Sequence, residues 1–242
     1  MGEIALEVKD LYITYNSMKT YSVKKNLLHF KGSDKNRIEA VKGVSFALEK
    51  GKILGIVGKN GSGKSTMLKS IAGIFAPDSG CVDLHGHSIS LMSIGVGFNN
   101  ELTGRENIAL SGMLLGFSKK EIEAKTEEII EFSELGKFID VPVRTYSSGM
   151  HSKLAFAITA ILETDIILVD EVLSVGDAKF KKKSYAKMKE LIGDENRTVV
   201  IVSHSTDTLD ELCDYILWIN DGEMVMYGTK DEVLPKYNEF MS

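Results

Sequence analysis

Gly58-Lys59-Asn60-Gly61-Ser62-Gly63-Lys64-Ser65-Thr66 is the segment that is most diagnostic of the protein's architecture. It matches the pattern G-x-x-x-x-G-K-[ST], in which backbone N–H groups surround phosphate oxygens. Lys64 is expected to reach the terminal phosphates of a nucleotide, and the Ser65 hydroxyl is expected to ligate Mg²⁺. The apolar run Ile53–Val57 predicts a strand that leads into this loop, and Lys64–Ile74 predicts a helix whose N-terminal amides face the anion. The stretch therefore predicts a phosphate loop between a strand and a helix.

Two later apolar runs end in side chains that can act on a bound nucleotide. The buried strand expected at Asp165–Asp170 brings a carboxylate to the carboxyl edge of the sheet, where Asp170 can hold Mg²⁺ directly or through water. Glu171 follows and is expected to orient or deprotonate the attacking water. The strand expected at Thr198–Val202 leads to His204, which we expect to contact the γ-phosphate and the attacking water, the alternative being an ordinary histidine at a strand end. Together these residues predict ATP hydrolysis.

Strands and helices alternate along the chain, which predicts an α/β fold of the P-loop NTPase type with a mainly parallel core sheet. An antiparallel β subdomain is expected from the alternating runs at residues 4–8 and 44–48. Capping boxes at Thr103–Glu106 and Ser118–Glu121 predict helices within a helical subdomain at about 98–150. Further helices are expected at about 150–162 and 179–192, followed by a hairpin around Asn220-Asp221-Gly222 and a closing helix at 231–240. We expect one domain over residues 1–242, with the hairpin and helix at about 215–242.

Residues 16–39 form a polar, Lys-rich stretch that we interpret as an insertion before the phosphate loop. One interpretation is a variable surface loop. The other is an amphipathic element that touches a membrane partner or the lipid interface. The sequence leaves both open.

The length, composition and net charge of the chain indicate which classes of protein it can belong to. The chain has 242 residues, of which 43% are hydrophobic, as expected for a compact globular protein. It contains no apolar run of about 18 residues and no secretory signal pattern, so we expect a cytoplasmic location. The net charge of −5 argues against a general nucleic-acid binder. The lysines between 179 and 189 are expected to form the solvated face of a helix, and Cys81 and Cys213 to be reduced, mostly structural thiols.

The phosphate loop, Tyr146-Ser-Ser-Gly-Met150, Asp170-Glu171 and His204 resemble the nucleotide-binding subunits of ABC transporters. The resemblance implies that Ser147, Ser148 and Gly149 contact the γ-phosphate of ATP held by the opposite subunit, so that a homodimer encloses two ATP molecules. Ser174-Val-Gly-Asp177 is similar to the D-loop of the family, which implies that Asp177 communicates across the dimer interface. Tyr15 is the best candidate for the aromatic residue that stacks on adenine.

Three residues depart from the family pattern. Asn99 occupies the position usually held by the Q-loop glutamine, where it can still offer a carbonyl to Mg²⁺ or water at a shorter reach. Tyr146 and Met150 replace the outer Leu and Gln of the signature. These departures put the usual coupling geometry in doubt, but not ATP binding.

The segments Gly95–Asn107 and Asp170–Phe180 resemble the subfamily that exports teichoic acids, O-antigens and related cell-surface polysaccharides. The resemblance implies a multispanning membrane permease as partner, docked near the Asn99 loop and the helical subdomain, with the glycan handled mainly by the permease. The ATPase would lie at the cytoplasmic face of the membrane. Some members carry a further carbohydrate-binding domain, whereas this chain stops shortly after Phe240, so polyprenyl-linked teichoic acid is the first expected cargo. Exporters of O-antigen, capsule, lipid or drug, and a soluble regulatory ATPase, are the alternatives.

Overall fold

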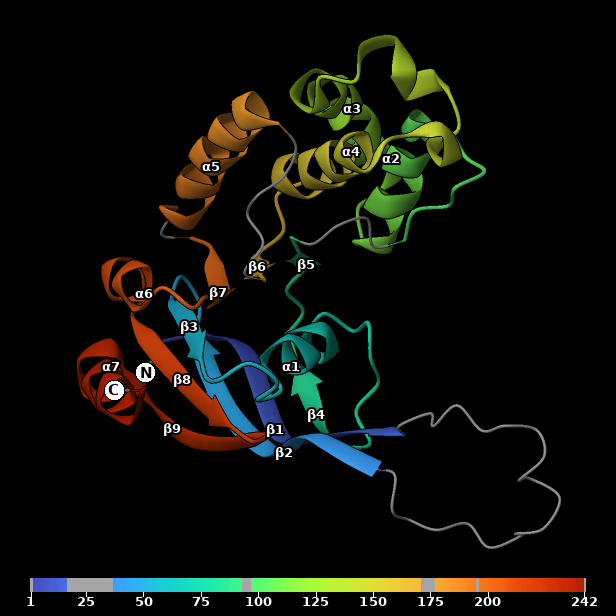
Figure 1. The fold of residues 1–242 in the computed structure, drawn as a ribbon. Helices are drawn as coiled ribbons and strands as arrows, with labels where there is room; N and C mark the ends of the chain where they lie inside the picture. The colour runs from blue at the N-terminus through green and yellow to red at the C-terminus, as the bar shows by residue number, and fades with distance from the viewer. Residues whose placement is uncertain (1, 17–36, 93–96, 171–176, 195, 242) are drawn as a thin grey trace, which may run out of the picture.

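The computed structural model describes residues 2–16, 37–92, 97–170, 177–194 and 196–241. Figure 1 shows two sheets in the lower part of the view and a group of helices, α2, α3 and α4, in the upper part. No helix in the described ranges is both long and apolar enough to cross a membrane.

The larger sheet has six strands and carries the phosphate loop. Its spatial order is β5-β6-β7-β3-β8-β9, in which β9 is antiparallel to β8 and the other neighbours are parallel. This order confirms the mainly parallel sheet that the sequence predicts. Strands β6 and β7 are buried along their whole length, as the continuous apolar runs require. The strands are β3 (Ile53–Val57), β5 (Ile89–Leu91), β6 (Ile166–Val169), β7 (Thr198–Val202), β8 (Tyr215–Asn220) and β9 (Glu223–Thr229).

The smaller sheet is antiparallel, with the order β2-β1-β4. Its strands are β1 (Ile4–Asn16), β2 (Arg37–Glu49) and β4 (Ser79–Asp83). Strands β1 and β2 are longer than predicted because register shifts break their alternation, one of them beside Asp10, whose φ is 45°. Residues 16 and 37–39, at the margins of the expected insertion, belong to β1 and β2. The rest of that segment, 17–36, lies outside the described residues.

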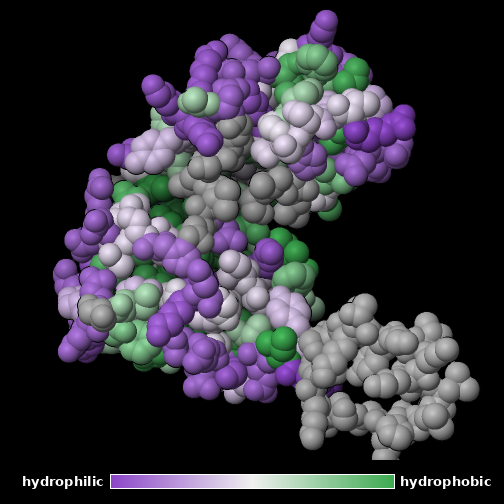
Figure 2. Space-filling model, in the orientation of Figure 1, coloured by the Kyte–Doolittle hydropathy of each residue, from purple (hydrophilic) through white to green (hydrophobic). Residues whose placement is uncertain are grey.

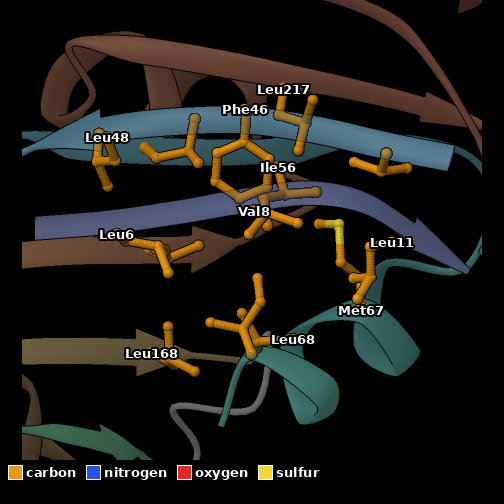
Figure 3. Close-up of a cluster of buried hydrophobic side chains, with 14 of the residues drawn as sticks. Leu6, Val8, Leu11, Phe46, Leu48, Ile56, Met67, Leu68, Leu168 and Leu217 are labelled. Carbon is orange, nitrogen blue, oxygen red and sulfur yellow. The ribbon is translucent and has the colours of Figure 1, made fainter. Parts of the chain in front are cut away.

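The two sheets share one hydrophobic core, drawn in Figure 3. Leu6 and Leu48 contribute from the smaller sheet, and Ile56 from the phosphate-loop strand. Met67 and Leu68 reach this core from helix α1 (Lys64–Ile71). All five side chains are fully buried, so the core fixes α1, and with it the phosphate loop, against both sheets.

Helices α2 (Gly104–Leu114), α3 (Lys119–Ser133) and α4 (Ser148–Ile161) pack around a separate core that includes Ile108, Ile129 and Leu154. Both predicted capping boxes are present, with Thr103 before α2 and Ser118 before α3. Two short 3₁₀ helices, Gly136–Asp140 and Val143–Thr145, connect α3 to α4.

Helices α5 (Ala178–Ile192), α6 (Thr206–Leu212) and α7 (Lys230–Met241) complete the fold. Helix α5 buries Phe180 and Met188 and leaves Lys181, Lys182 and Lys189 exposed, as predicted for a solvated helix face. Figure 2 shows hydrophilic residues over the surface near α5.

The remaining local predictions concern the last hairpin and the two cysteines. The predicted hairpin around Asn220-Asp221-Gly222 is present, and Asp221 and Gly222, between β8 and β9, have φ values of 49° and 85°, as a tight hairpin turn requires. Both cysteines are free; Cys213 is buried, which raises the pKa of its thiol to about 12, whereas Cys81 is exposed. The structural role expected of the thiols therefore suits Cys213 better than Cys81.

Candidate nucleotide-binding site

The phosphate loop joins β3 to α1 and packs directly on the backbone of neighbouring strands. A Cβ atom on Gly58 would lie 2.1 Å from the carbonyl oxygen of Ile219, and one on Gly63 would lie 2.1 Å from that of Ala40. Gly63 also has a φ of 102°. Only glycine fits these two positions, because a side chain would collide with backbone that cannot move away.

Hydrogen bonds close the loop upon itself. The Ser62 N–H donates to the Lys59 carbonyl at 3.1 Å, and the Gly222 N–H donates to the Ser62 carbonyl at 3.0 Å. The tip of the loop, Lys59-Asn60-Gly61, is exposed. The loop is therefore ordered by its own backbone and by the β8–β9 turn.

Lys64 lies folded into this loop. Its side chain is buried, and its Nζ donates to the carbonyl oxygens of Gly58 at 2.7 Å and Lys59 at 2.8 Å. Burial lowers the pKa of Lys64, and the nearby Asp170 carboxylate opposes that shift. The loop thus holds a cationic group that two neutral carbonyls only partly satisfy.

Ser65 and Asp170 lie together, as the motifs predict. Ser65 is in the first turn of α1 and Asp170 directly follows β6, and the Ser65 hydroxyl donates to Oδ1 of Asp170 at 3.2 Å. A hydroxyl and a carboxylate offer the hard oxygen ligands that Mg²⁺ takes, which makes this pair suitable for the ion.

The surroundings of the loop fit a phosphate group. Helix α1 has no acidic residue in its first turn, and Gly63 offers no side chain to cap its amides. Within the described part of the chain, the buried Ser62 Oγ has no hydrogen-bond partner. Free amides, a cation and an unpaired hydroxyl at a helix N-terminus are the donors that an anion requires.

Tyr15 lies beside this site at the end of β1. Its hydroxyl donates to Oγ1 of Thr66 at 3.3 Å, and its ring meets that of Phe75 edge to face with centroids 6.0 Å apart. The ring is 37% exposed. An accessible aromatic ring next to α1 supports the predicted stacking on adenine, which stays a prediction.

The signature residues lie at the start of α4, in the helical group of Figure 1. Ser147 caps the helix by accepting from the Met150 N–H at 3.2 Å, and Ser148 and Gly149 form its first turn, which has no acidic residue. The Tyr146 hydroxyl donates to the Phe138 carbonyl at 2.7 Å, so Tyr146 anchors the motif to the helical group.

The other expected site residues follow the strand ends. His204 is exposed and lies two residues after the end of β7, the neighbour of β6, and thus at the same sheet edge as Asp170. Glu171 lies outside the described residues. Asp177 caps α5 by accepting from the N–H groups of Lys179 and Phe180, each at 3.0 Å.

Asp177 also pairs with Lys153 of α4, whose Nζ lies 2.6 Å from Oδ2 of Asp177. The Lys153 hydrogen bond, together with the amide bonds of the cap, lowers the pKa of Asp177 to about 2. Within one chain, Asp177 therefore joins the helix of the signature motif to α5. Its predicted role across a dimer interface stays a prediction.

Asn99 makes its contacts within its own loop. Its carboxamide oxygen accepts from the Glu101 N–H at 3.0 Å, and its backbone N–H donates to Oδ1 of Asn107 at 2.8 Å. Asn107 is fully buried and also donates to the carbonyls of Asn99, Leu102 and Thr103. Sequence reasoning missed Asn107, although a polar residue among the apolar positions of a helix was a usable signal. The predicted contact of Asn99 with Mg²⁺ stays a prediction.

The sequence is similar to a known protein family and to known export ATP-binding proteins. The sequence profile of the ABC transporter family matches residues 41–174. The O-antigen export system ATP-binding protein RfbB of Myxococcus xanthus is 46% identical over 209 residues, which make up 86% of this chain and 48% of that protein. The teichoic acids export ATP-binding protein TagH of Lactococcus lactis is 43% identical over 217 residues, or 90% of this chain and 46% of that protein. The chain thus spans about half the length of both relatives.

Among solved structures, the ATP-binding cassette MJ0796, described as a dimer in a post-hydrolysis state bound to ADP and Pi, has a TM-score of 0.67 and 23% sequence identity. The likeness covers 93% of this chain and 98% of that chain. It confirms the fold class.

Proposed function

Because this chain belongs to the ABC transporter family, we propose that it is the ATP-hydrolysing subunit of an exporter of cell-surface polysaccharide. The observation that carries the enzymatic part is the convergence of a buried Lys64 with the Ser65–Asp170 pair at one sheet edge. This set combines a phosphate-binding cation with oxygen ligands for a metal.

Each residue has a distinct task in this proposal. The amides of the phosphate loop and Lys64 bind the phosphates, Ser65 and Asp170 hold Mg²⁺, and Tyr15 stacks on the base. When bound, Mg²⁺·ATP supplies the reacting γ-phosphate and a cation that neutralises its charge. Glu171 takes a proton from the attacking water, and His204 orients that water.

We further propose a homodimer that encloses two ATP molecules. The signature residues Ser147, Ser148 and Gly149 lie at the start of α4, whose first turn has no acidic residue, on the helical group rather than on the phosphate-loop core. A second chain is then needed to bring a signature motif to each phosphate loop. The dimeric form described for MJ0796 supports this arrangement.

The proposed transport partner is a multispanning membrane permease, and the chain would bind it peripherally at the cytoplasmic face of the membrane. The export of O-antigen and of teichoic acids, for which RfbB and TagH are named, supports this partner and a polysaccharide cargo. We propose polyprenyl-linked teichoic acid as the first candidate and O-antigen as the second. Chain length does not separate them, because the chain spans about half of both relatives.

The test is purification of the tagged full chain from gently solubilised native membranes, with mass spectrometry of proteins and lipid-linked glycans. Recovery of a permease with a polyprenyl-linked polyol-phosphate polymer would support teichoic acid export. Recovery of a permease with a polymer of sugars alone would indicate O-antigen export. A permease that carries neither would point to a lipid or drug exporter. Recovery of only soluble partners would contradict the exporter and favour a regulatory ATPase.

The enzymatic part is tested separately with purified chain. We expect Asp170→Asn to lower Mg²⁺-dependent ATP hydrolysis by roughly 100-fold or more, because the metal ligand loses its charge. Asp140→Asn, which changes a carboxylate that pairs with Arg105 of the helical group at 2.8 Å, is the matched control. An equal loss of ATP hydrolysis in both variants would show that Asp170 does not act as a metal ligand.

A further inference from the structure

Three aromatic side chains gather next to the start of the phosphate loop. Trp218 of β8 meets Tyr237 of α7 with ring centroids 5.6 Å apart, and Phe240 of α7 with centroids 5.0 Å apart. Trp218 is paired in parallel register with Val57, the last residue before the loop. We call Trp218, Tyr237 and Phe240 the C-terminal aromatic cluster.

The cluster touches the first two residues of the loop. Tyr237 is only 6% exposed, and its hydroxyl lies close enough to the Gly58 backbone for that backbone to affect the pKa of Tyr237. The Nζ of Lys59 lies 4.4 Å from the centroid of the Phe240 ring, a cation–π contact. Burial raises the pKa of Tyr237, so its hydroxyl stays protonated at neutral pH.

These two loop residues are also the ones that hold Lys64. Its Nζ donates to the carbonyl oxygens of Gly58 and Lys59. A displacement of either residue would therefore move an acceptor of the phosphate-binding lysine. The contacts form a continuous series from α7, through the first two loop residues, to the Lys64 ammonium.

We propose that Tyr237 and Phe240 are positioning residues for ATP binding, which hold Gly58 and Lys59 in the geometry that the phosphates require. The inference rests on ATP binding by the phosphate loop. A loop that is already ordered loses less conformational freedom when the nucleotide binds, so the cluster raises affinity without touching the phosphates. The competing explanation is that the cluster only packs α7 onto the sheet.

The test uses the full chain with Phe240→Leu, Tyr237→Phe and Lys59→Met. Titration with Mg²⁺·ATP in a calorimeter gives Kd, and steady-state hydrolysis gives KM and kcat. We expect each variant to raise Kd and KM by roughly 3- to 10-fold. For Phe240→Leu and Tyr237→Phe, which lie outside the phosphate loop, kcat at saturating ATP should stay within about 2-fold of wild type. Phe240→Tyr, which keeps an aromatic face for Lys59, should restore the wild-type Kd.

Two further variants distinguish a role of the cluster in positioning the phosphate loop from a role in packing α7 onto the sheet. Tyr185→Leu removes an exposed ring that has a similar contact with Lys189, at 5.4 Å, on α5, and it should leave Kd unchanged. If the Lys59–Phe240 contact is the cause, the double variant Lys59→Met/Phe240→Leu should bind ATP no worse than either single variant.

Trp218 is the single tryptophan of the chain, so its emission reports on the cluster directly. ATP should change this emission in the wild type and change it less in Phe240→Leu. A lowered Tm with an unchanged Kd in Phe240→Leu and Tyr237→Phe would show packing alone and overturn the inference. Failure of the wild type to bind ATP would instead overturn the proposed function, and this inference with it.

Discussion

At the scale of single residues, the phosphate loop depends on a buried cation. The Lys64 ammonium is held by two backbone carbonyls, and burial lowers its pKa. Burying a charge against neutral partners is unfavourable, so an anion that replaces those partners gains from the exchange. In the proposed function, the folded chain is thereby prepared for phosphate before any nucleotide arrives.

Lys64→Ala should weaken ATP binding by roughly 10- to 100-fold, because it removes a charge-assisted hydrogen bond to phosphate. Calorimetric titration with Mg²⁺·ATP measures the effect. Lys69→Ala, which changes a lysine in the last turn of the same helix, should bind ATP as the wild type does. Undiminished affinity in Lys64→Ala would overturn the role assigned to this residue.

The hydrogen bonds of Asn107 should also contribute to the stability of the fold. Its buried carboxamide accepts from the Asn99 N–H and donates to three carbonyls. Asn107→Leu should lower the free energy of unfolding by about 3 kcal/mol, because it leaves several of these backbone groups unpaired. Urea denaturation measures the change, with exposed Asn100→Ala as the control. Equal stability of the two variants would mean that water replaces the lost bonds.

At the scale of elements, charged side chains link α3, α4 and α5. Glu134, directly after α3, lies 3.9 Å from the Lys153 ammonium of α4 and 3.6 Å from that of Lys183 in α5. Lys153 also pairs with Asp177 and lies 5.0 Å from the centroid of the Phe180 ring. The helix that begins with the signature motif is therefore joined to both neighbouring helices.

The ion pair between Asp177 of the α5 cap and Lys153 of α4 should weaken in acid. The folded-state pKa of Asp177, about 2, lies below the ordinary value of 3.8. Its charge therefore stabilises the fold fully above about pH 4, and that contribution is lost as the pH falls toward 2. Thermal unfolding should show Asp177→Asn less stable than the wild type at pH 6, with the difference narrowing below pH 4. A constant difference across this range would contradict the assignment.

The sequence predicted some of these elements better than others, for physical reasons. The bounds of β7 and the starts of α2 and α3 were predicted because an apolar run and two capping boxes are local signals. The position of Asp170 next to the phosphate loop was predicted because two motifs meet at one sheet edge, although the hydrogen bond from Ser65 to Asp170 was not. The full length of β1, with its register shifts, and the Lys153–Asp177 pair were missed, since both depend on tertiary contacts.

At the scale of the whole molecule, one chain carries, in separate parts of its fold, the two groups of residues that the proposed homodimer would bring together. The phosphate loop and Tyr15 belong to the two-sheet core, whereas Ser147, Ser148 and Gly149 belong to the helical group. Figure 1 shows α1 and the start of α4 in separate parts of the fold. Association of two chains would join these two groups of residues.

Glu171→Gln should trap this dimer in the presence of ATP, because the water-activating carboxylate is removed while the phosphate and metal ligands remain. Size-exclusion chromatography with light scattering should show a dimer with Mg²⁺·ATP and a monomer without nucleotide. Lys64→Ala/Glu171→Gln, which loses the phosphate cation, is the matched control and should stay monomeric. A monomeric Glu171→Gln chain at saturating ATP would contradict the dimer proposal.

The order of strands in the larger sheet has a consequence for biosynthesis. Strand β3, which leads into the phosphate loop, pairs with β7 and β8, which begin at Thr198 and Tyr215. It therefore leaves the ribosome long before either neighbour has been translated, and such long-range pairing is slow to form. A nascent chain thus carries an unpaired apolar strand until translation passes β8, a state that chaperones are suited to protect. We expect the growing polypeptide to acquire nucleotide affinity only after most of it has been made.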